Sequence, residues 1–500
     1  MHVFPLLSSL IFLPLLGGLA ALAFADRPAQ ARLLCLLTAL AELALALLIP
    51  LLFASGGGLD LVEDYGWIAP LHVRYSLGMD GLSYVLTLLT AFLGVLGILT
   101  SWREIKEGAA AFYVLLLAAL STAIGVFLAR DLLLFYLFWE AQLIPMFFLI
   151  GRYGHENRRH AAVKFFLFSM VGGLPMLLAV IALMLAGQDL SLAALAASPV
   201  GGAMQGWCAA AFLLAFAVKT PIVPVHTWLP EAHTQAPTAG SLLLAGVLLK
   251  TGAYAILRWA FPLFPQASAT AAPWLGGLGL VGLFHASWTA LAQRDAKRLV
   301  AYSSIAHMGL ILFALSAHDR IGLSGAVVQM VSHALTTGAL FVMVGMLAER
   351  FHSRALADFG GLWKRMPVYG AFLLFFAMAS AGLPGLSNFV GELLILVGSF
   401  RVYPAATCLA FGGIVVGLAY LLRMLQGTIF GPEGPLAIGP QNDPAGEHAG
   451  TYSPPADLSA REVVVLTAFA LAVLLVGLHP APLLDMVREP LDALAAGWPR

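Results

Sequence analysis

The sequence predicts an all-α, polytopic membrane protein with about 14 transmembrane helices. Of its 500 residues, 60% are hydrophobic and 10% are charged, whereas soluble domains carry about 25% charged residues. Apolar runs of about 20 residues, each long enough to cross a bilayer as a helix, recur from one end of the chain to the other. Helices are expected because lipid offers no partner for backbone N–H and C=O groups, which a helix pairs internally.

Hydropathy and the positions of proline, glycine and charged residues place the spans in order along the chain. The predicted spans are 3–24, 30–54, 80–101, 111–128, 130–150, 160–186, 205–229, 238–262, 272–291, 297–316, 322–348, 368–398, 403–430 and 461–480. The first span has no basic region before it and is longer than the apolar core of a signal peptide, so we expect a retained helix. Alternation in LHVRYS predicts a small hairpin within Leu59–Leu77, and Gly431–Ser459, rich in Pro, Gly and Asp, predicts a surface loop.

Basic residues are distributed unevenly between the two sets of loops that these spans create. About fifteen Lys and Arg residues fall in one set, which includes Arg103, Arg158 and Arg350, and about seven in the other set and the tails. Cytoplasmic loops carry the excess of Lys and Arg. We therefore expect a multi-pass protein of a bacterial cytoplasmic (inner) membrane with both termini on the periplasmic side.

Two predicted spans are interrupted in a similar way, five spans apart. Span 7 contains Lys219, Pro221 and Pro224, and span 12 contains AGLPGLSNFVGE, which holds Pro384 and Gly385. Because five is odd, the second copy of a five-helix repeat must enter the membrane from the opposite side. Inverted repeats with broken helices are typical of ion-coupled transporters, whose sites lie near the midplane of the membrane.

The repeat divides a single integral membrane domain, 1–500, into parts. These are helices 1–3 (1–110), the first inverted repeat with helices 4–8 (111–262), the second with helices 9–13 (272–430), the surface loop (431–460), and helix 14 with the C-terminal tail (461–500).

Six titratable side chains fall inside predicted spans, where an ionised group costs roughly 2.5–3.5 kcal/mol on insertion scales. They are Glu140, Lys219, Lys250, His307, His333 and Glu392. Each has a structural alternative: a lysine can extend to the interface, a histidine can be hydrogen-bonded in the core, and Glu392 can lie at the membrane edge. His285 is interpreted as structural, and Arg423 lies either near an interface or within the bundle.

Taken together, these six side chains predict a proton route parallel to the membrane. Such a route needs groups that bind and release protons, linked by hydrogen bonds or water. Histidine does this near neutral pH, and a carboxylate near a desolvated lysine controls whether the lysine keeps its proton. The prolines after Lys219 free backbone carbonyls and admit water where an intact helix would be dry.

Other kinds of site are not supported. GLGLVG (Gly277–Gly282) lies inside a span, so helix packing by small residues explains it better than a nucleotide site does. His226, Glu231 and His233 match no zinc motif and are interpreted as polar residues that cap a helix–helix turn.

There is no P-loop or cysteine cluster, and the three cysteines are expected to be buried structural thiols. We expect no metal, cofactor or redox centre in this chain. The net charge of zero gives no reason to expect nucleic acid. A bare channel is less favoured, because pores use rings of like charge.

Five stretches resemble the antiporter-like membrane subunits of respiratory complex I (NADH:quinone oxidoreductase). They are GMDGLS (Gly78–Ser83), LFWEAQLIPMFFLIG (Leu137–Gly151), VKTPIVPVHTWLPEAHTQAPTAGSLLLAGVLLKTGAYAILR (Val218–Arg258), DAKRLVAYSSIAHMG (Asp295–Gly309) and GLPGLSNFVGE (Gly382–Glu392). They occur in the family's order and extend over most of the chain. HTWLPEAHTQAPTAGS favours the subunit M (chain 4) branch over its paralogues.

The resemblance implies fourteen helices with two inverted five-helix repeats. It implies that Glu140 pairs with Lys219, that Lys250 links two half-channels through His307 and His333, and that Glu392 is the counterpart of Lys219. It also implies a translocase subunit in a hetero-oligomer, surrounded by lipids and other membrane subunits, while FMN, iron–sulfur clusters and quinone are held by other chains. A subunit of a multi-subunit cation/proton antiporter or of a membrane-bound hydrogenase is the alternative.

Overall fold

The computed structural model of the protein describes residues 5–53, 59–71, 73–438 and 456–498. Within these ranges, 13 helices are long and apolar enough to cross a membrane. Two shorter apolar helices, Pro367–Ser380 and Ser387–Phe400, follow each other where one further span is predicted. The prediction of an all-α membrane protein with about 14 spans is therefore confirmed.

The helices follow the predicted order, and most begin and end within a few residues of the predicted spans. The first half contains α1 (Leu6–Ala21), α2 (Pro28–Phe53), α3 (Gly81–Thr100), α4 (Ala109–Leu128), α5 (Leu132–Ala141), α6 (Leu143–Tyr153), α7 (Arg158–Leu185), α8 (Leu192–Ala197), α9 (Gly202–Lys219), α10 (Trp228–Gln235), α11 (Thr238–Leu243), α12 (Leu249–Ala255) and α13 (Phe261–Leu263). The second half contains α14 (Pro265–Ala292), α15 (Ala296–Ala317), α16 (Arg320–Phe351), α17 (Pro367–Ser380), α18 (Ser387–Phe400), α19 (Pro404–Thr428), α20 (Pro435–Ile438), α21 (Ala460–Leu478) and α22 (Ala481–Ala496).

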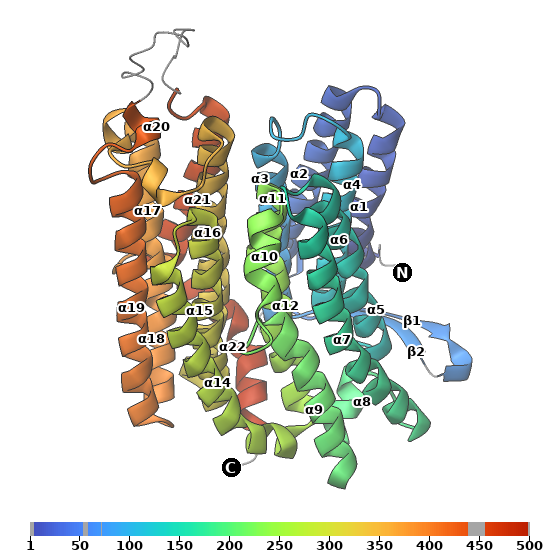
Figure 1. Ribbon diagram of the computed structural model, residues 1–500. Helices are drawn as coiled ribbons and strands as arrows, with labels where there is room; N and C mark the ends of the chain where they lie inside the picture. The colour runs from blue at the N-terminus through green and yellow to red at the C-terminus, as the bar shows by residue number, and fades with distance from the viewer. Residues whose placement is uncertain (1–4, 54–58, 72, 439–455, 499–500) are drawn as a thin grey trace.

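The predicted hairpin is present. Strands β1 (Leu61–Ile68) and β2 (Val73–Met79) pair antiparallel, with Leu61 opposite Met79 and Tyr65 opposite Tyr75. It projects from the side of the bundle next to α1 and α5 (Figure 1). The predicted surface loop, Gly431–Ser459, lies partly outside the described residues, and its described part contains the short helix α20.

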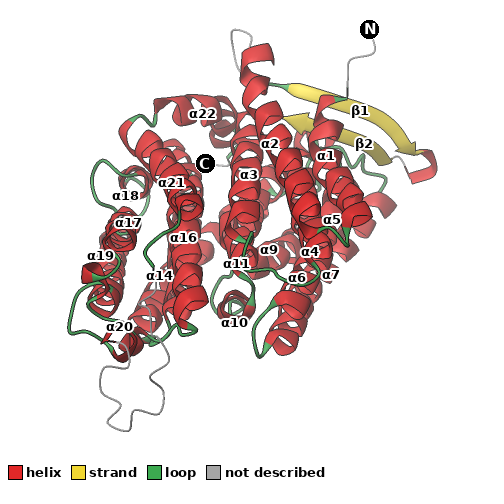
Figure 2. Ribbon diagram, turned by 90° about the horizontal axis from the view of Figure 1, so that it is seen from above, coloured by secondary structure: helices red, strands yellow, loops and turns green. Residues whose placement is uncertain are grey.

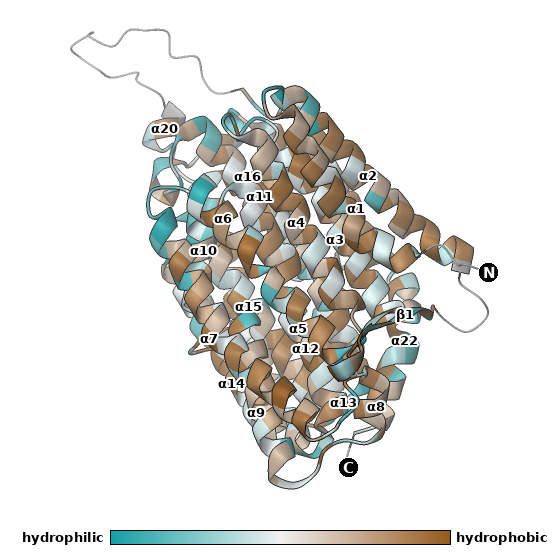
Figure 3. Cartoon of the chain, turned by 90° about the vertical axis from the view of Figure 1, so that its right-hand side faces the viewer, coloured by the Kyte–Doolittle hydropathy of each residue, from teal (hydrophilic) through white to brown (hydrophobic). Residues whose placement is uncertain are grey.

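Helices α1–α13 and α14–α21 form two groups of roughly parallel helices, coloured blue to green and yellow to red in Figure 1. Seen from above, α22 lies beside both α3 of the first group and α16 of the second (Figure 2), and it packs against both. Hydrophobic residues dominate the sides of the bundle (Figure 3), as expected for helices that face lipid.

The helices in the middle of the bundle are enclosed by the others. In the most apolar 18-residue stretch of the segment Thr238–Leu263, every residue is buried. In the corresponding stretches of α15 and α16, 94% of the residues are buried, against 28% in α19. A side chain on the central helices therefore has no lipid-facing surface, which excludes extension of Lys250 to the interface. Of the three free cysteines, Cys35 and Cys208 are buried as predicted, but Cys408 is exposed on α19, so that prediction is wrong for Cys408.

Spans 7 and 12 are both broken, as predicted. Helix α9 ends at Lys219, and α10 begins only at Trp228. The intervening segment contains Pro221 and Pro224, with a cis bond between Val223 and Pro224. Proline has no backbone N–H and cannot continue a helix. The second break, between α17 and α18, contains Gly382 and Gly385, both with positive φ (75° and 91°), which glycine adopts without strain.

Candidate proton-transfer site

Lys219 is held at the first break, in contact with α5. Its side chain is 3% exposed. The Nζ atom donates a hydrogen bond to the Trp139 carbonyl oxygen (3.0 Å) and lies 4.0 Å from the centre of the Trp139 ring. The indole face attracts the cation, and the carbonyl accepts one of its three protons. Since α9 ends at this residue, the ammonium group lies where the helix gives way to an irregular segment.

Glu140 is the next residue after Trp139, but it forms no ion pair with Lys219 within 4 Å in the described part of the chain. Its Oε1 atom is buried and has no hydrogen-bond partner among the residues that the structure describes. The carboxylate packs against Gly173 of α7, where a Cβ atom would collide with it. The predicted pair is therefore adjacent through Trp139, and a small movement of α5 against α9 changes the separation of the two charges.

Lys250 and His333 are in direct contact at the centre of the bundle. Lys250 is 0% exposed. It donates a hydrogen bond to the Ala245 carbonyl, and its Nζ atom lies 2.6 Å from Nδ1 of His333 on α16. Helix α12, which carries Lys250, is flanked by two π-helical segments, Leu244–Leu248 and Ile256–Ala260. Such segments occur often at functional sites.

The break that holds Lys219 also lies against the helix of Lys250. Gly252 of α12 packs so closely on Thr220 that a Cβ atom at Gly252 would collide with both its side chain and its backbone. Thr220 is 1% exposed, and its hydroxyl group has no hydrogen-bond partner in the described residues. The two lysine-bearing segments are thus in contact through Gly252 and Thr220, and no hydrogen bond joins the two lysines among the described residues.

His307 and Glu392 continue the arrangement toward the second break. The His307 ring on α15 meets the His333 ring edge to face, with centroids 5.3 Å apart. His307 and Glu392 of α18 line one cavity together with Tyr420, and the cavity has room for a water molecule. The Glu392 carboxylate packs against Gly382, where no Cβ atom would fit. The imidazole and the carboxyl group therefore line one space that admits water.

Helix α18 is fixed against α16 one turn from these groups. Thr336 Oγ1 of α16 donates to Asn388 Oδ1 (3.2 Å), and Thr336 and Asn388 lie near His333 and Glu392 along their helices. The six predicted residues therefore form three neighbouring groups. These are Glu140 with Lys219, Lys250 with His333, and His307 with Glu392, and all three lie in the interior of the bundle.

Three titratable residues around the turn before the Lys250 segment, two of them buried and one (Glu104) half-buried, were not predicted as site residues. His233 of α10, interpreted from the sequence as a capping residue, is fully buried and stacked on Phe341 (4.5 Å between centroids), and both its ring nitrogens lack hydrogen-bond partners among the described residues. From the sequence, Lys297 belongs to the basic loop residues and Glu104 has no assigned role. In the structure, Lys297 is only 2% exposed. No local signal reveals these positions, because each lies next to a span boundary and its burial depends on neighbouring helices.

The other polar residues that the sequence analysis considered lie as follows. Glu231 pairs with Lys164 (2.6 Å), and His226 meets His285 edge to face. No group of His, Cys, Asp and Glu residues in the described part of the chain is arranged to hold a metal ion. Arg423 is exposed on α19 and donates to the Leu291 carbonyl.

An ion pair between Arg258 and Asp80 lies at the end of the bundle opposite the basic loops. Arg258 NH2 lies 2.7 and 2.6 Å from the two Asp80 carboxylate oxygens and also donates to Ser83. Tyr254, one turn before Arg258, donates from its hydroxyl group to the Phe127 carbonyl (2.7 Å). Burial alone would raise the pKa of Asp80, but the nearby Arg258 and Arg130 outweigh this effect and lower the pKa to about 2.

Comparison with known proteins gives a consistent family. Residues 129–417 match the family described as NADH:quinone oxidoreductase/Mrp antiporter, TM. NADH-quinone oxidoreductase subunit M of Pseudomonas aeruginosa is 44% identical over 432 residues, which are 84% of this chain and 82% of that protein. Subunit M of Escherichia coli K12 is 40% identical over 469 residues (89% and 90%), and that of Rhodobacter capsulatus is 40% identical over 505 residues (96% and 94%).

Solved structures agree with the sequence comparisons. A chain of respiratory complex I from Thermus thermophilus with bound NADH superposes with a TM-score of 0.88 at 32% identity, over 99% of this chain and 100% of that one. A chain of the Mrp complex from Dietzia sp. DQ12-45-1b superposes with a TM-score of 0.85 at 20% identity, over 98% of each chain. The second likeness, at this identity, concerns the fold alone.

Proposed function

Since this chain belongs to the NADH:quinone oxidoreductase/Mrp antiporter family, and within it to the subunit M branch, we propose that Glu140, Lys219, Lys250, His307, His333 and Glu392 carry protons through it. The chain is an antiporter-like membrane subunit of NADH:quinone oxidoreductase, and its partners are other membrane subunits of that complex. The alternatives, a cation/proton antiporter and a membrane-bound hydrogenase, are not favoured, because the three relatives compared above, at 40–44% identity, are subunit M proteins of NADH-quinone oxidoreductase.

The direct contact between Lys250 and His333 carries this proposal. When His333 is neutral, its Nδ1 atom accepts a proton from the Lys250 ammonium group across 2.6 Å. The transfer breaks one N–H bond and forms another, so no electron moves. His333 and His307 then face each other, and Glu392 receives the proton across their shared cavity through one water molecule.

Lys219 and Glu140 act as the element that responds to the rest of the complex. A carboxylate that approaches Lys219 favours its ammonium form, and one that withdraws favours proton release. Because the two residues are adjacent but not paired, a shift of α5 is enough to change the charge state. We propose that other subunits of the complex hold FMN, iron–sulfur clusters and quinone. Iron–sulfur clusters are held by grouped cysteines, and the three cysteines of this chain, Cys35, Cys208 and Cys408, lie far apart in the sequence.

The two halves are proposed to be inverted repeats over 111–262 and 272–430. Supporting this division, the fourth span of each half is the broken one, α9 with α10 and α17 with α18. The protein is proposed to lie in a bacterial cytoplasmic membrane with both termini on the periplasmic side. Arg103 and Lys106, between α3 and α4, and Arg294 and Arg298, at the start of α15, support this orientation.

Substitution of Lys219 tests the function. In Lys219→Ala, the complex is expected to assemble and to oxidise NADH with an artificial electron acceptor, while NADH-driven proton pumping in inverted membrane vesicles falls at least about tenfold, because the chain loses a proton carrier. Lys106→Ala, which removes an exposed loop lysine, is the matched control and is expected to pump normally. Normal pumping by the Lys219 variant would contradict the role given to Lys219.

A further inference from the structure

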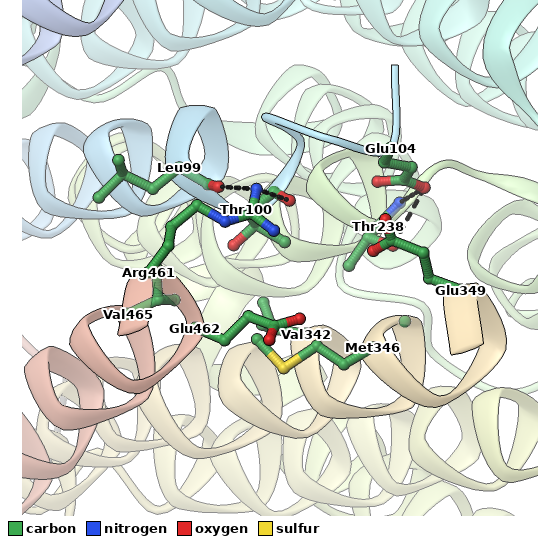
Figure 4. Close-up of a pocket in the computed structure, with 11 residues that line it drawn as sticks. Leu99, Thr100, Glu104, Thr238, Val342, Met346, Glu349, Arg461, Glu462 and Val465 are labelled. Carbon is green, nitrogen blue, oxygen red and sulfur yellow. Dashed lines mark hydrogen bonds between the residues drawn. The ribbon is translucent and has the colours of Figure 1, made fainter. Parts of the chain in front are cut away.

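A second polar cavity lies at the basic-loop end of the bundle, away from the His307 and Glu392 cavity. It has room for about one water molecule. Its lining includes Glu104 from the loop after α3, Thr238 at the start of α11, Glu349 of α16, and Arg461 and Glu462 of α21 (Figure 4). Residues from both halves of the molecule therefore meet at this point, directly above the segment that carries Lys250.

Glu104 and Lys297 hold the two ends of one short turn. Glu104 Oε1 accepts hydrogen bonds from the backbone N–H of Thr238 (3.0 Å) and from its hydroxyl group (3.1 Å). Lys297 Nζ donates to the carbonyl oxygen of Ala236 (2.6 Å). The turn Ala236–Thr238 connects α10, which contains His233, with the helical segment that contains Lys250. A carboxyl group and a lysine amino group thus meet at the connection between these two elements.

The second carboxylate oxygen of Glu104 has no such partner. Oε2 is buried and makes no hydrogen bond in the described residues. The basic groups around the cavity are already engaged: Arg461 donates to the Leu99 carbonyl (2.9 Å), and Arg350 pairs with Glu462 (2.6 Å). Burial raises the pKa of Glu104, and Glu349 raises it further, whereas Thr238 and Lys297 act in the opposite direction.

A purely structural role leaves this arrangement unexplained. A neutral glutamine would accept both hydrogen bonds from Thr238 without leaving a charged oxygen buried and unsatisfied, as Oε2 of the half-buried Glu104 is in the described residues. An ionisable group with one free oxygen, beside a cavity that admits water, is instead suited to binding and releasing a proton.

The interior side of the turn leads to Lys250. His233 lies one turn before Ala236, fully buried with both ring nitrogens free of hydrogen bonds in the described region. Its backbone carbonyl is held by Ser241 Oγ (3.0 Å), and its ring is held flat against Phe341. Lys297 and Lys250 both lie within electrostatic range of the His233 ring. His233 is therefore close to both lysines.

We propose that Glu104 is a proton-loading carboxyl group that takes protons from the basic-loop face and passes them, through Lys297 and His233, toward Lys250. This inference rests on the proposed function. A proton from water binds Oε2 of Glu104. It moves to neutral Lys297 as the O–H bond breaks and an N–H bond forms, and then to His233, which returns Lys297 to its neutral form. One proton enters, none is consumed and no electron moves.

The test compares Glu104→Gln, Glu104→Asp and the control Glu107→Gln in the whole complex. Glutamine keeps the acceptor for Thr238 but cannot carry a proton, and Glu107 is an exposed carboxylate in the same loop. NADH oxidation by an artificial acceptor reports assembly, and proton pumping in inverted vesicles is measured from pH 6 to pH 9. We expect Glu104→Gln to assemble and to pump protons at least about threefold more slowly than the wild type. The difference is expected to grow as the pH rises, because free protons become scarce.

Each outcome decides the inference. Glu104→Asp keeps an ionisable group, so it is expected to recover part of the pumping that glutamine loses and to shift the pH profile. Wild-type pumping with a wild-type pH profile in Glu104→Gln would overturn the role. So would equal losses in the Gln and Asp variants together with poor assembly, because that pattern indicates a structural clamp. Lys250→Ala separates the two proposals. If this variant pumps protons normally, the proposed function fails. If it loses pumping while Glu104→Gln pumps normally, only the Glu104 route is refuted.

Discussion

At the scale of single residues, the space around each carboxylate is defined by a glycine. Glu140 packs against Gly173, and Glu392 packs against Gly382. In both cases the adjacent backbone segment carries no Cβ atom at the point where the carboxylate lies. A methyl group would push the carboxylate away, and a displacement of about 1 Å is enough to slow a reaction that depends on close positioning. These two glycines therefore fix the positions of the two acidic groups without forming a hydrogen bond to either.

Gly173→Ala is the corresponding prediction. Gly173 lies inside α7, where alanine is conformationally favoured, so backbone strain does not explain a defect. The added methyl group is expected to push Glu140 away from its place beside Trp139 and Lys219 and to lower NADH-driven pumping at least about threefold, with normal assembly. Gly277→Ala in α14, where a Cβ atom meets nothing within 4 Å, is the control. Equal pumping by both variants would show that Glu140 tolerates displacement.

At the scale of elements, the helix that carries Lys250 is anchored at both ends by charged groups. Its beginning is held through Glu104 and Thr238, and its far end through Arg258 and Asp80 at the N-terminus of α3. Between these anchors the two π-helical segments give it an irregular hydrogen-bond pattern. We infer that rigid ends and an irregular middle allow Lys250 to change partners without displacing the helix.

The Asp80 anchor predicts a pH-dependent contribution to stability. The pKa of Asp80 is about 2 in the folded chain and 3.8 as the ordinary value, so the folded state binds fewer protons than the unfolded state between these values. The contribution of about 2 kcal/mol is fully present above pH 4 and is lost as the pH falls toward 2. Asp80→Asn is therefore expected to lower the unfolding temperature of the purified complex at pH 6 and to differ less from wild type at pH 3.

An exposed ion pair provides the comparison for this measurement. Asp485 and Arg488 of α22 lie 2.6 Å apart, and both side chains are 61% exposed. Exposed pairs are worth about 0–1 kcal/mol, so Asp485→Asn is expected to leave the unfolding temperature nearly unchanged. If the two variants behaved alike, burial of the Asp80 pair would have no energetic consequence.

At the scale of the whole molecule, α22 joins the two groups of helices on the side opposite the basic loops. It packs against α3 and α16 (Figure 2). Asp492 pairs with Arg320 (2.5 Å), and Trp498 stacks on His318 with 3.7 Å between ring centroids. The tail predicted after helix 14 is therefore a structural helix, and its position places the described C-terminus at this face.

The orientation of the molecule predicts the location of that face. A reporter enzyme that is active only outside the cytoplasm is expected to be active when fused after Arg500 and inactive when inserted after Lys106, in the loop between α3 and α4. The reason is the excess of Lys and Arg at the α3–α4 end, which cytoplasmic loops retain. The opposite pattern of activity would reverse the proposed direction of proton movement.

The sequence by itself determined the membrane class, the order of the spans, the two breaks and the six candidate proton carriers. These features are local. A run of apolar residues, a proline after a helix, or a lysine inside an apolar run can be recognised without knowing its neighbours. The hairpin was also predictable, because alternation along a short segment is itself a property of the sequence.

Only the tertiary structure decided which groups meet. Lys250 and His333 are 83 residues apart in the chain, and their contact depends on how α12 and α16 are rotated and packed. The structure also separated Glu140 from direct pairing with Lys219. It buried Lys297 and His233 and half-buried Glu104, all near span boundaries where hydropathy gives no indication of burial. Burial and pairing are set by the helices around a residue, and no local pattern in the sequence encodes that arrangement.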